Sequence, residues 1–493
     1  MTPRDFAMAD HLDSDQGKGN GDASSPPHPS SHTLHHTPTS TLMDRLRRFM
    51  RPRHGQAYEP LNGGAGTADD EGSDSREEPP FSSLEYSVFL LLGVTMLWAW
   101  NMFLAAAPYF QRRFESDEWI RTHFQSAILS VFTVTNLGSM LVLTKLQSNA
   151  SYPKRISSSL LMNVVSFTLL ALSTTFFRDV SPKGYLSFLL VMVFLASLAT
   201  GLSQNGVFSY ASGYGRPEYT QAIMTGQAIA GVLPCVAEIV LVLAVPEPTS
   251  SEQEDVPAQG SSTSAFSYFL TATGISVATL VVFMYLLGQQ TSRSHAKRTL
   301  EADGEDQPAG HGERQVVGLW TLFKKLHWLA GAIFICFAVT MMYPVFATSI
   351  LSVRPPASAP PVFQPFVFIP LAFLFWNVGD LLGRLLPLIP HLALTAYPRT
   401  IFVLSLARLL YIPLYLFCNI RGNGAVVNSD FFYLGIVQLG FGITNGWLGS
   451  ICMMGAAEWV DFGEREAAGG FMGLCLVGGL TVGSLLSFLA GKA

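Results

Sequence analysis

Apolar runs of about 20 residues recur along the chain from residue 86 onward, with polar or charged stretches between them. A helix of about 20 residues crosses the roughly 30 Å hydrocarbon core of a bilayer. Only helices satisfy their own backbone polar groups within such a run, and no run alternates as a barrel strand does. The sequence therefore predicts an all-α polytopic membrane protein with eleven spans, near residues 86–107, 126–146, 156–177, 185–211, 218–245, 265–288, 328–352, 364–389, 400–418, 430–456 and 468–490.

The overall composition agrees with a chain that lies mostly in a membrane. Of its 493 residues, 49% are hydrophobic and only 13% are charged, which is too apolar for an ordinary soluble protein. No basic tract with interleaved aromatic residues indicates nucleic-acid binding. The five cysteines fall in apolar runs, where they are expected to pack as small hydrophobes. Neither a cofactor nor a metal site is expected.

The N-terminal segment, residues 1–85, differs from the rest because Ser, Thr, Pro, Gly, His and acidic residues dominate it. Too few apolar residues are present to offset the entropy cost of ordering, so we expect a disordered tail. Within it, Tyr58 and Leu61 have the Tyr-x-x-bulky-apolar spacing that clathrin adaptors read. This motif predicts an adaptor as a partner and sorting to a vacuolar or lysosomal membrane, with the plasma membrane as the alternative.

Basic residues mark alternate connections between the predicted spans, and such loops favour the cytoplasmic side. They precede the first span, link the second to the third, and lie between the sixth and seventh: Arg45, Arg47, Arg48, Arg51, Arg53, Lys145, Lys154, Arg155, Arg293, Lys297, Arg298, Lys324 and Lys325. We therefore expect a cytoplasmic N-terminus and, with an odd number of spans, an extracytoplasmic C-terminus.

The longest connection between spans, residues 289–327, separates six spans from five. This division predicts a six-helix bundle at 86–288, a cytoplasmic linker at 289–327 and a five-helix bundle at 328–493. Solute carriers often place a substrate site between two such halves and rock one half against the other. The layout resembles the major facilitator type.

Two full charges interrupt the eighth span, in WNVGDLLGRLLP at residues 376–387. On a helix, Asn377, Asp380 and Arg384 project from one face, and Gly379 and Gly383 form a neighbouring strip that permits close helix packing. A carboxylate and a guanidinium four residues apart can pair, which lowers the cost of either charge in lipid. The pair is either a structural salt bridge or part of a polar substrate cavity.

Neutral polar side chains occur in other spans. Gln204 and Asn205 lie in the fourth span, and Gln227 lies in the fifth. Trp100 and Asn101 in the first span offer a flat face and an amide, although tryptophan near a membrane boundary also serves as an anchor. Uncharged donors and acceptors suit a hydroxylated or heterocyclic solute, and they equally suit hydrogen bonds between helices.

Several motifs, in conserved order along residues 86–490, resemble those of the equilibrative nucleoside transporter family. WNVGDLLGR resembles the eighth-helix signature of that family, and TNGWLGSICM with EREAAGGFMGLCLVGGLTVGSLLSFL resembles its tenth and eleventh helices. YTQAIMTGQAIAG, LWAWNMFLAAAPYF and AVTMMYP resemble its fifth, first and seventh helices. The resemblance implies passage of nucleosides, and sometimes nucleobases, by alternating access. It assigns the substrate site to Trp100, Asn101, Asn205, Gln227, Asp380 and Arg384, with Gln204, Asn377 and Asn445 as secondary candidates.

Other classes of protein fit the sequence less well. An intramembrane aspartyl protease needs two catalytic aspartates, and Asp380 has no second aspartate deep in a span; we expect no enzyme. A major-facilitator-type carrier of another small polar solute, such as a sugar, is the alternative, because architecture alone does not fix the substrate. Both facilitated diffusion and proton-linked transport are compatible with the residues.

Overall fold

The computed structural model describes residues 81–147, 150–177, 179–244, 262–302, 317–355 and 359–490. Within these ranges every regular element is a helix, apart from an isolated bridge between Ile350 and Ile420. The expected tail up to residue 80, with Tyr58 and Leu61, and residues 303–316 of the expected linker lie outside the described residues.

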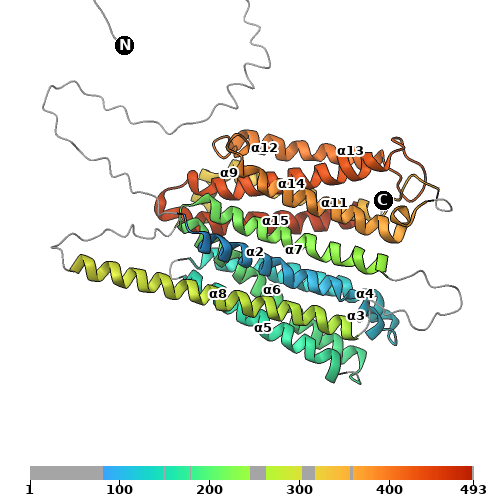
Figure 1. The fold of residues 1–493 in the computed structure, drawn as a ribbon, viewed down its shortest axis with the longest axis horizontal. Coiled ribbons are helices and arrows are strands. Elements are labelled where there is room, and N and C mark those ends of the chain that lie inside the picture. The colour runs from blue at the N-terminus through green and yellow to red at the C-terminus, as the bar shows by residue number, and fades with distance from the viewer. Residues whose placement is uncertain are drawn as a thin grey trace, which may run out of the picture. The chain divides into compact units, whose positions relative to one another are not determined.

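Fourteen α-helices run through the described part of the chain, joined in places by short 3-10 turns (Figure 1). Their bounds are α2 Ser83–Ala105, α3 Ala107–Arg113, α4 Glu118–Lys145, α5 Tyr152–Phe176, α6 Pro182–Gly213, α7 Pro217–Ala244, α8 Ser262–Ala302, α9 Leu319–Thr340, α10 Tyr343–Ala347, α11 Pro365–Leu385, α12 Pro398–Ala407, α13 Tyr411–Leu416, α14 Gly440–Gly455 and α15 Arg465–Ala490. The turns are η1 Pro361–Phe363, η2 Leu386–Leu388, η3 Pro390–Leu392, η4 Arg408–Leu410, η6 Ala456–Glu458 and η7 Phe462–Glu464, and η5 Phe432–Leu439 is a π-helix.

Ten helical stretches among the described residues are long and apolar enough to cross a membrane, and each coincides with a predicted span. The predicted span at 430–456 is also helical, but it changes from the π-helix η5 to α14 at Gly440, so the 16-residue α14 alone is short for a crossing. The prediction of an all-α polytopic membrane protein is confirmed. One further difference is that α8 continues as a helix to Ala302, beyond the expected bundle boundary at 288.

In chain order, the helices before residues 303–316 form an N-terminal set, α2–α8, and those after them form a C-terminal set, α9–α15. In the N-terminal set, α2 packs on α7 and α8, and α5 packs on α6 and α8. In the C-terminal set, α11 packs on α14, and α9 packs on α12, α14 and α15. The sets meet where α7 contacts α11 and α14, and where α4 and α6 contact α15 (Figure 1).

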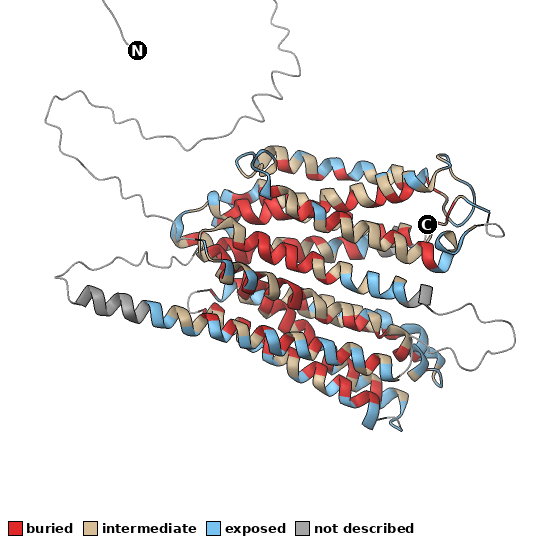
Figure 2. Ribbon diagram, viewed as in Figure 1, coloured by how far each residue is buried: buried red, intermediate tan, exposed pale blue. Residues whose placement is uncertain are grey.

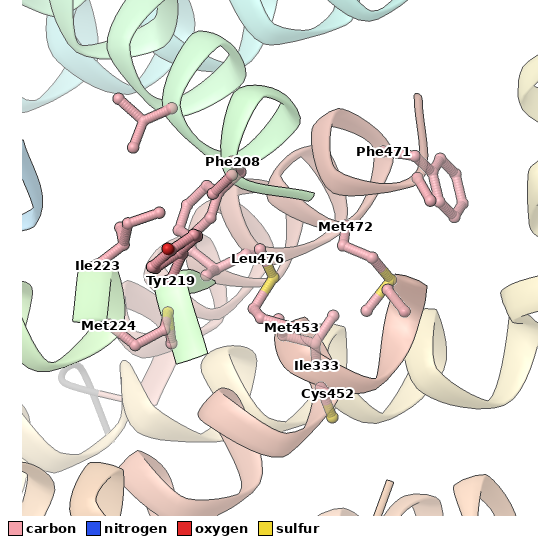
Figure 3. Packing of buried hydrophobic residues seen from close by; sticks show 14 of the residues in the cluster. Phe208, Tyr219, Ile223, Met224, Ile333, Cys452, Met453, Phe471, Met472 and Leu476 are labelled. Atoms are coloured by element: carbon pink, nitrogen blue, oxygen red, sulfur yellow. The ribbon is translucent and has the colours of Figure 1, made fainter. Parts of the chain in front are cut away.

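A buried apolar cluster joins the two sets of helices. It includes Phe208 of α6, Met224 of α7, Ile333 of α9, Met453 of α14 and Met472 of α15 (Figure 3). Large apolar side chains such as Val281 and Met284 of α8 are instead exposed, and Figure 2 shows the exposed stretches of that helix in pale blue. Outward apolar surface of this kind suits contact with lipid rather than with water.

Candidate functional site at the interface of the two helix sets

The two charges predicted in the eighth span form an ion pair in α11. The Nε atom of Arg384 lies 2.8 Å from Oδ2 of Asp380, and both side chains are buried. The four-residue spacing puts both on one helix face. Pairing with a hydrogen bond reduces the desolvation cost of each charge, but a buried pair adds little stability by itself. The pair therefore needs further partners around it.

Asn445 of α14 supplies the second partner of Asp380. Its Nδ2 donates to Asp380 Oδ1 at 2.6 Å, and its Oδ1 accepts from the hydroxyl of Thr340 in α9 at 2.6 Å. Both carboxylate oxygens of Asp380 are therefore bonded, one to a charged donor and one to a neutral donor. Asn445, a secondary candidate in the sequence, lies directly at the ion pair.

Arg384 links the C-terminal helix set to α7 of the N-terminal set. Its Nη1 donates to the backbone oxygen of Met224 at 2.5 Å and to Oε1 of Gln227 at 3.1 Å. In return, Gln221 Nε2 donates to the backbone oxygen of Arg384 at 3.2 Å. The fixed fork of the guanidinium allows one side chain to bond Asp380 and α7 together. The structure thus brings three predicted site residues, Asp380, Arg384 and Gln227, into one polar cluster.

Glycines in α11 and α14 allow this cluster to form. A Cβ added at Gly383 would overlap the backbone oxygen of Ile443, and one added at Gly446 would overlap the backbone oxygen of Asp380. Gly379 and Gly442 make the same kind of contact one turn away. The helix backbones therefore touch, as small residues at four-residue spacing permit. Only at this separation does the short side chain of Asn445 reach Asp380.

Three other predicted residues make contacts of their own and do not bond Asp380. Asn101 Nδ2 donates to the backbone oxygen of Ala230 at 2.6 Å, which ties α2 to α7. Asn377 Nδ2 donates to its own helix at Phe373 and lies 3.4 Å from Sγ of Cys235 across the interface. The ring of Trp100 packs on Phe132 at a centroid distance of 4.2 Å.

The structure places Asn205 in a different network, between α4, α5 and α6. Its Oδ1 accepts from the guanidinium of Arg155, and its Nδ2 lies 3.4 Å from the hydroxyl of Thr144. Neighbouring Gln204 is buried, and its Oε1 has no hydrogen-bond partner among the described residues. The fourth-span amides are therefore not joined to the ion pair.

One buried charge connected to the cluster escaped the sequence reasoning. Arg408 is 1% exposed and donates from Nη2 to the Thr340 hydroxyl at 3.1 Å. The signal was present, because Arg408 interrupts the predicted span at 400–418 as Asp380 interrupts the eighth. Intramembrane charges mark functional positions by default, and the same rule would have selected it.

The helices form a polytopic membrane fold similar to the major facilitator type. The fold is similar to that of the proton:xylose symporter XylE, with a TM-score of 0.53 at 10% sequence identity, covering 83% of this chain and 88% of that one. It is also similar to the human organic anion transporter MFSD10, with a TM-score of 0.52 at 14% identity, covering 84% of this chain and 95% of that one.

The sequence narrows this class further. Residues 190–491 match the family model described as nucleoside transporter. The yeast nucleoside transporter FUN26 from Saccharomyces cerevisiae is 30% identical over 460 residues, covering 83% of this chain and 84% of the relative. Human equilibrative nucleoside transporter 1 is 26% identical, covering 82% of this chain and 95% of the relative. The chain belongs to the nucleoside transporter family. The resemblance inferred from its motifs and its predicted role as a nucleoside carrier are confirmed.

The glycine contact between α11 and α14 yields a direct stability prediction. We expect Gly446→Ala to lower the thermal midpoint of the detergent-purified protein by several degrees, because its methyl group must push α14 away from Asp380. Gly274→Ala in α8 is the matched control, because a Cβ there meets no atom within 4 Å, and alanine favours a helix. Equal midpoints for the two variants would contradict close packing at Gly446.

Proposed function

We propose that this protein moves nucleosides by alternating access and that Asp380, Arg384 and Gln227 bind the solute. The observation that carries the proposal is the position of Arg384, which is bonded at once to Asp380 in its own helix and to Met224 and Gln227 in the opposite helix set. The bonds of Arg384 therefore depend both on a bound solute and on the separation of the two helix sets.

The chemistry of the cluster suits a nucleoside. A carboxylate accepts hydrogen bonds from neighbouring ribose hydroxyls, a guanidinium donates to hydroxyl and base oxygens, and the amide of Gln227 can do both. Charged hydrogen bonds to a solute are worth about 1.5–3 kcal/mol each. Asn101 and Asn377 extend the proposed site along α2 and α11, where an amide can contact the base, and Trp100, next to Asn101 in α2, is proposed as a further contact although its ring packs on Phe132. Asn205 and Gln204 of α6 are proposed as more distant contributors to the substrate site. Asn445 is proposed as the group that orients Asp380.

Alternating access follows from the bonds that cross the interface. Rocking of one helix set against the other breaks the contacts of Arg384 with Met224 and Gln227 and the contact of Gln221 with Arg384. A bound nucleoside replaces the bonds that Arg384 loses, so the opening of the interface depends on the solute. This dependence is what a carrier requires, because only differential affinity for two states shifts their populations.

We favour facilitated diffusion over proton-linked transport. Asp380 accepts from Arg384 at one oxygen and from Asn445 at the other. Neither bond calls for a proton on the carboxylate, and Arg384 keeps its own charge throughout. A nucleoside gradient alone then drives the cycle.

Uptake into proteoliposomes tests this function. We expect saturable uptake of adenosine and uridine that excess hexose does not inhibit and that a pH gradient does not accelerate. Asp380→Asn keeps the shape but removes the charge, so we expect Vmax/KM for adenosine to fall about tenfold or more. The exposed Asp179 between α5 and α6 gives the matched control, Asp179→Asn, which should transport normally.

Two outcomes would contradict the proposal. Saturable hexose uptake without competition by nucleosides would favour the sugar-carrier alternative. Normal nucleoside uptake by the double variant Asp380→Asn with Arg384→Gln would reduce the ion pair to a structural role.

The membrane and orientation are proposed from the sequence. Basic residues at one end of the helices, such as Lys154, Arg155 and Lys324, support a cytoplasmic N-terminus and an extracytoplasmic C-terminus. Tyr58 and Leu61 support adaptor-mediated sorting of part of the protein to a vacuolar or lysosomal membrane, where a carrier would export products of nucleic-acid breakdown.

Imaging of a fluorescent fusion tests the sorting motif. We expect the intact protein on vacuolar or lysosomal membranes as well as at the cell surface, and Tyr58→Ala with Leu61→Ala at the cell surface alone, because an adaptor must read both side chains. Identical plasma-membrane distributions of the two proteins would leave the motif without a role.

A further inference from the structure

Arg408 is a second arginine buried inside the C-terminal helix set. It lies where α12 ends and the 3-10 turn η4 begins, and it is among the largest side chains that are fully buried. Within the described ranges no carboxylate lies at ion-pair distance from it. A guanidinium stays charged in proteins, and a buried charge without a counter-charge is costly. The position of Arg408 therefore calls for a physical explanation.

Every terminal nitrogen of Arg408 is bonded inside the protein. Its Nη1 donates to the backbone oxygen of Cys336 and lies 2.9 Å from Sγ of that residue. Its Nη2 donates to Thr340 at 3.1 Å and to the backbone oxygen of Phe441 at 3.5 Å. The ring of Phe441 covers the guanidinium at 4.4 Å. Its Nε is also buried and has no hydrogen-bond partner among the described residues. Arg408 is thus enclosed, and its hydrogen bonds reach Asp380 only through neighbouring residues.

A series of hydrogen bonds runs from Arg408 through Thr340 and Asn445 to Asp380, and each bond in it has a defined donor and acceptor. Arginine has no acceptor, so the Thr340 oxygen must accept from Nη2. At the other end, the Asp380 carboxylate accepts from Asn445 Nδ2, so the oxygen of Asn445 faces Thr340 and accepts from its hydroxyl at 2.6 Å. With its oxygen facing Thr340, Asn445 presents Nδ2 to Asp380 Oδ1. Each bond in the series therefore orients the next.

We propose that Arg408 is a positioning residue of the nucleoside site, acting through Thr340 and Asn445 on Asp380. This inference rests on the proposed role of Asp380 in binding the solute. Asn445 has two orientations that differ by rotation of its amide. The wrong orientation would set its oxygen against the Asp380 carboxylate, which is repulsive. Arg408 donates to the Thr340 oxygen and holds it in place, and the Thr340 hydroxyl, which donates to Asn445 Oδ1, stabilises the other orientation.

The proposal separates binding from movement of the helices. Without the series, Asp380 Oδ1 loses its oriented donor, so the carboxylate no longer holds a fixed direction toward the ribose. The affinity for the nucleoside then falls. Arg384 keeps its own bonds to α7, so the conformational step retains its rate.

Adenosine uptake by matched variants in proteoliposomes tests whether this series of hydrogen bonds positions Asp380. Thr340→Val removes the hydroxyl at constant shape and leaves Arg408 in place. We expect KM for adenosine to rise about five- to tenfold, with Vmax within about twofold of the unmodified protein. Thr340→Ser retains the hydroxyl and should restore KM. The exposed Thr348 at the end of α10 supplies the control Thr348→Val, which should leave KM unchanged.

The double variant Arg408→Gln with Thr340→Val tests whether the two residues act as one unit. If Arg408 acts only through Thr340, the double variant raises KM no further than Thr340→Val does, because the effects of substitutions within one network are not additive. The proposal is overturned if the two substitutions multiply their effects on KM, or if Thr340→Val leaves KM unchanged. The Thr340→Val result decides even where Arg408→Gln fails to fold. Absence of adenosine uptake by the unmodified protein would instead refute the proposed function, so the two failures are distinguishable.

Discussion

The ion pair between Asp380 and Arg384 is the interaction on which the described interface depends. Two charges can lie inside a membrane protein only if their bonds replace those of water. Three helices supply these bonds: α14 through Asn445, α7 through Met224 and Gln227, and α11 itself. The pair thereby holds together helices that are far apart in the sequence, and it places its charges where the two helix sets meet.

Close packing and polarity work together at this interface. The glycine contacts between α11 and α14 fix the distance at which Asn445 reaches Asp380, and Gly93 and Gly226 bring α2 and α7 together by similar backbone contacts. In the proposed cycle these closely packed pairs move as units, and the bonds of Arg384 to α7 are the ones that change. In the proposed function, binding and movement are therefore joined in the side chain of Arg384.

The sequence predicted what depends on local pattern and missed what depends on the packing of distant helices. Hydropathy located the spans, and helical spacing predicted the pair of Asp380 with Arg384. The pattern could not predict that Arg155 from α5 bonds Asn205, because the register between helices is a tertiary property. Nor does hydropathy distinguish the π-helix η5 from the α-helix that continues it. Arg408 was visible in the sequence, but its link to Asp380 runs through Thr340, which lies within the AVTMMYP motif without being predicted as a site residue.

The most direct test of the account is a cryo-EM structure of the full-length protein with adenosine bound. We predict that the ribose hydroxyls lie within hydrogen-bond distance of Asp380 and that Arg384 has exchanged its bond to Gln227 or Met224 for one to the nucleoside. Adenosine bound elsewhere, with every bond of Asp380 and Arg384 unchanged, would contradict the central claim that this buried pair recognises the solute.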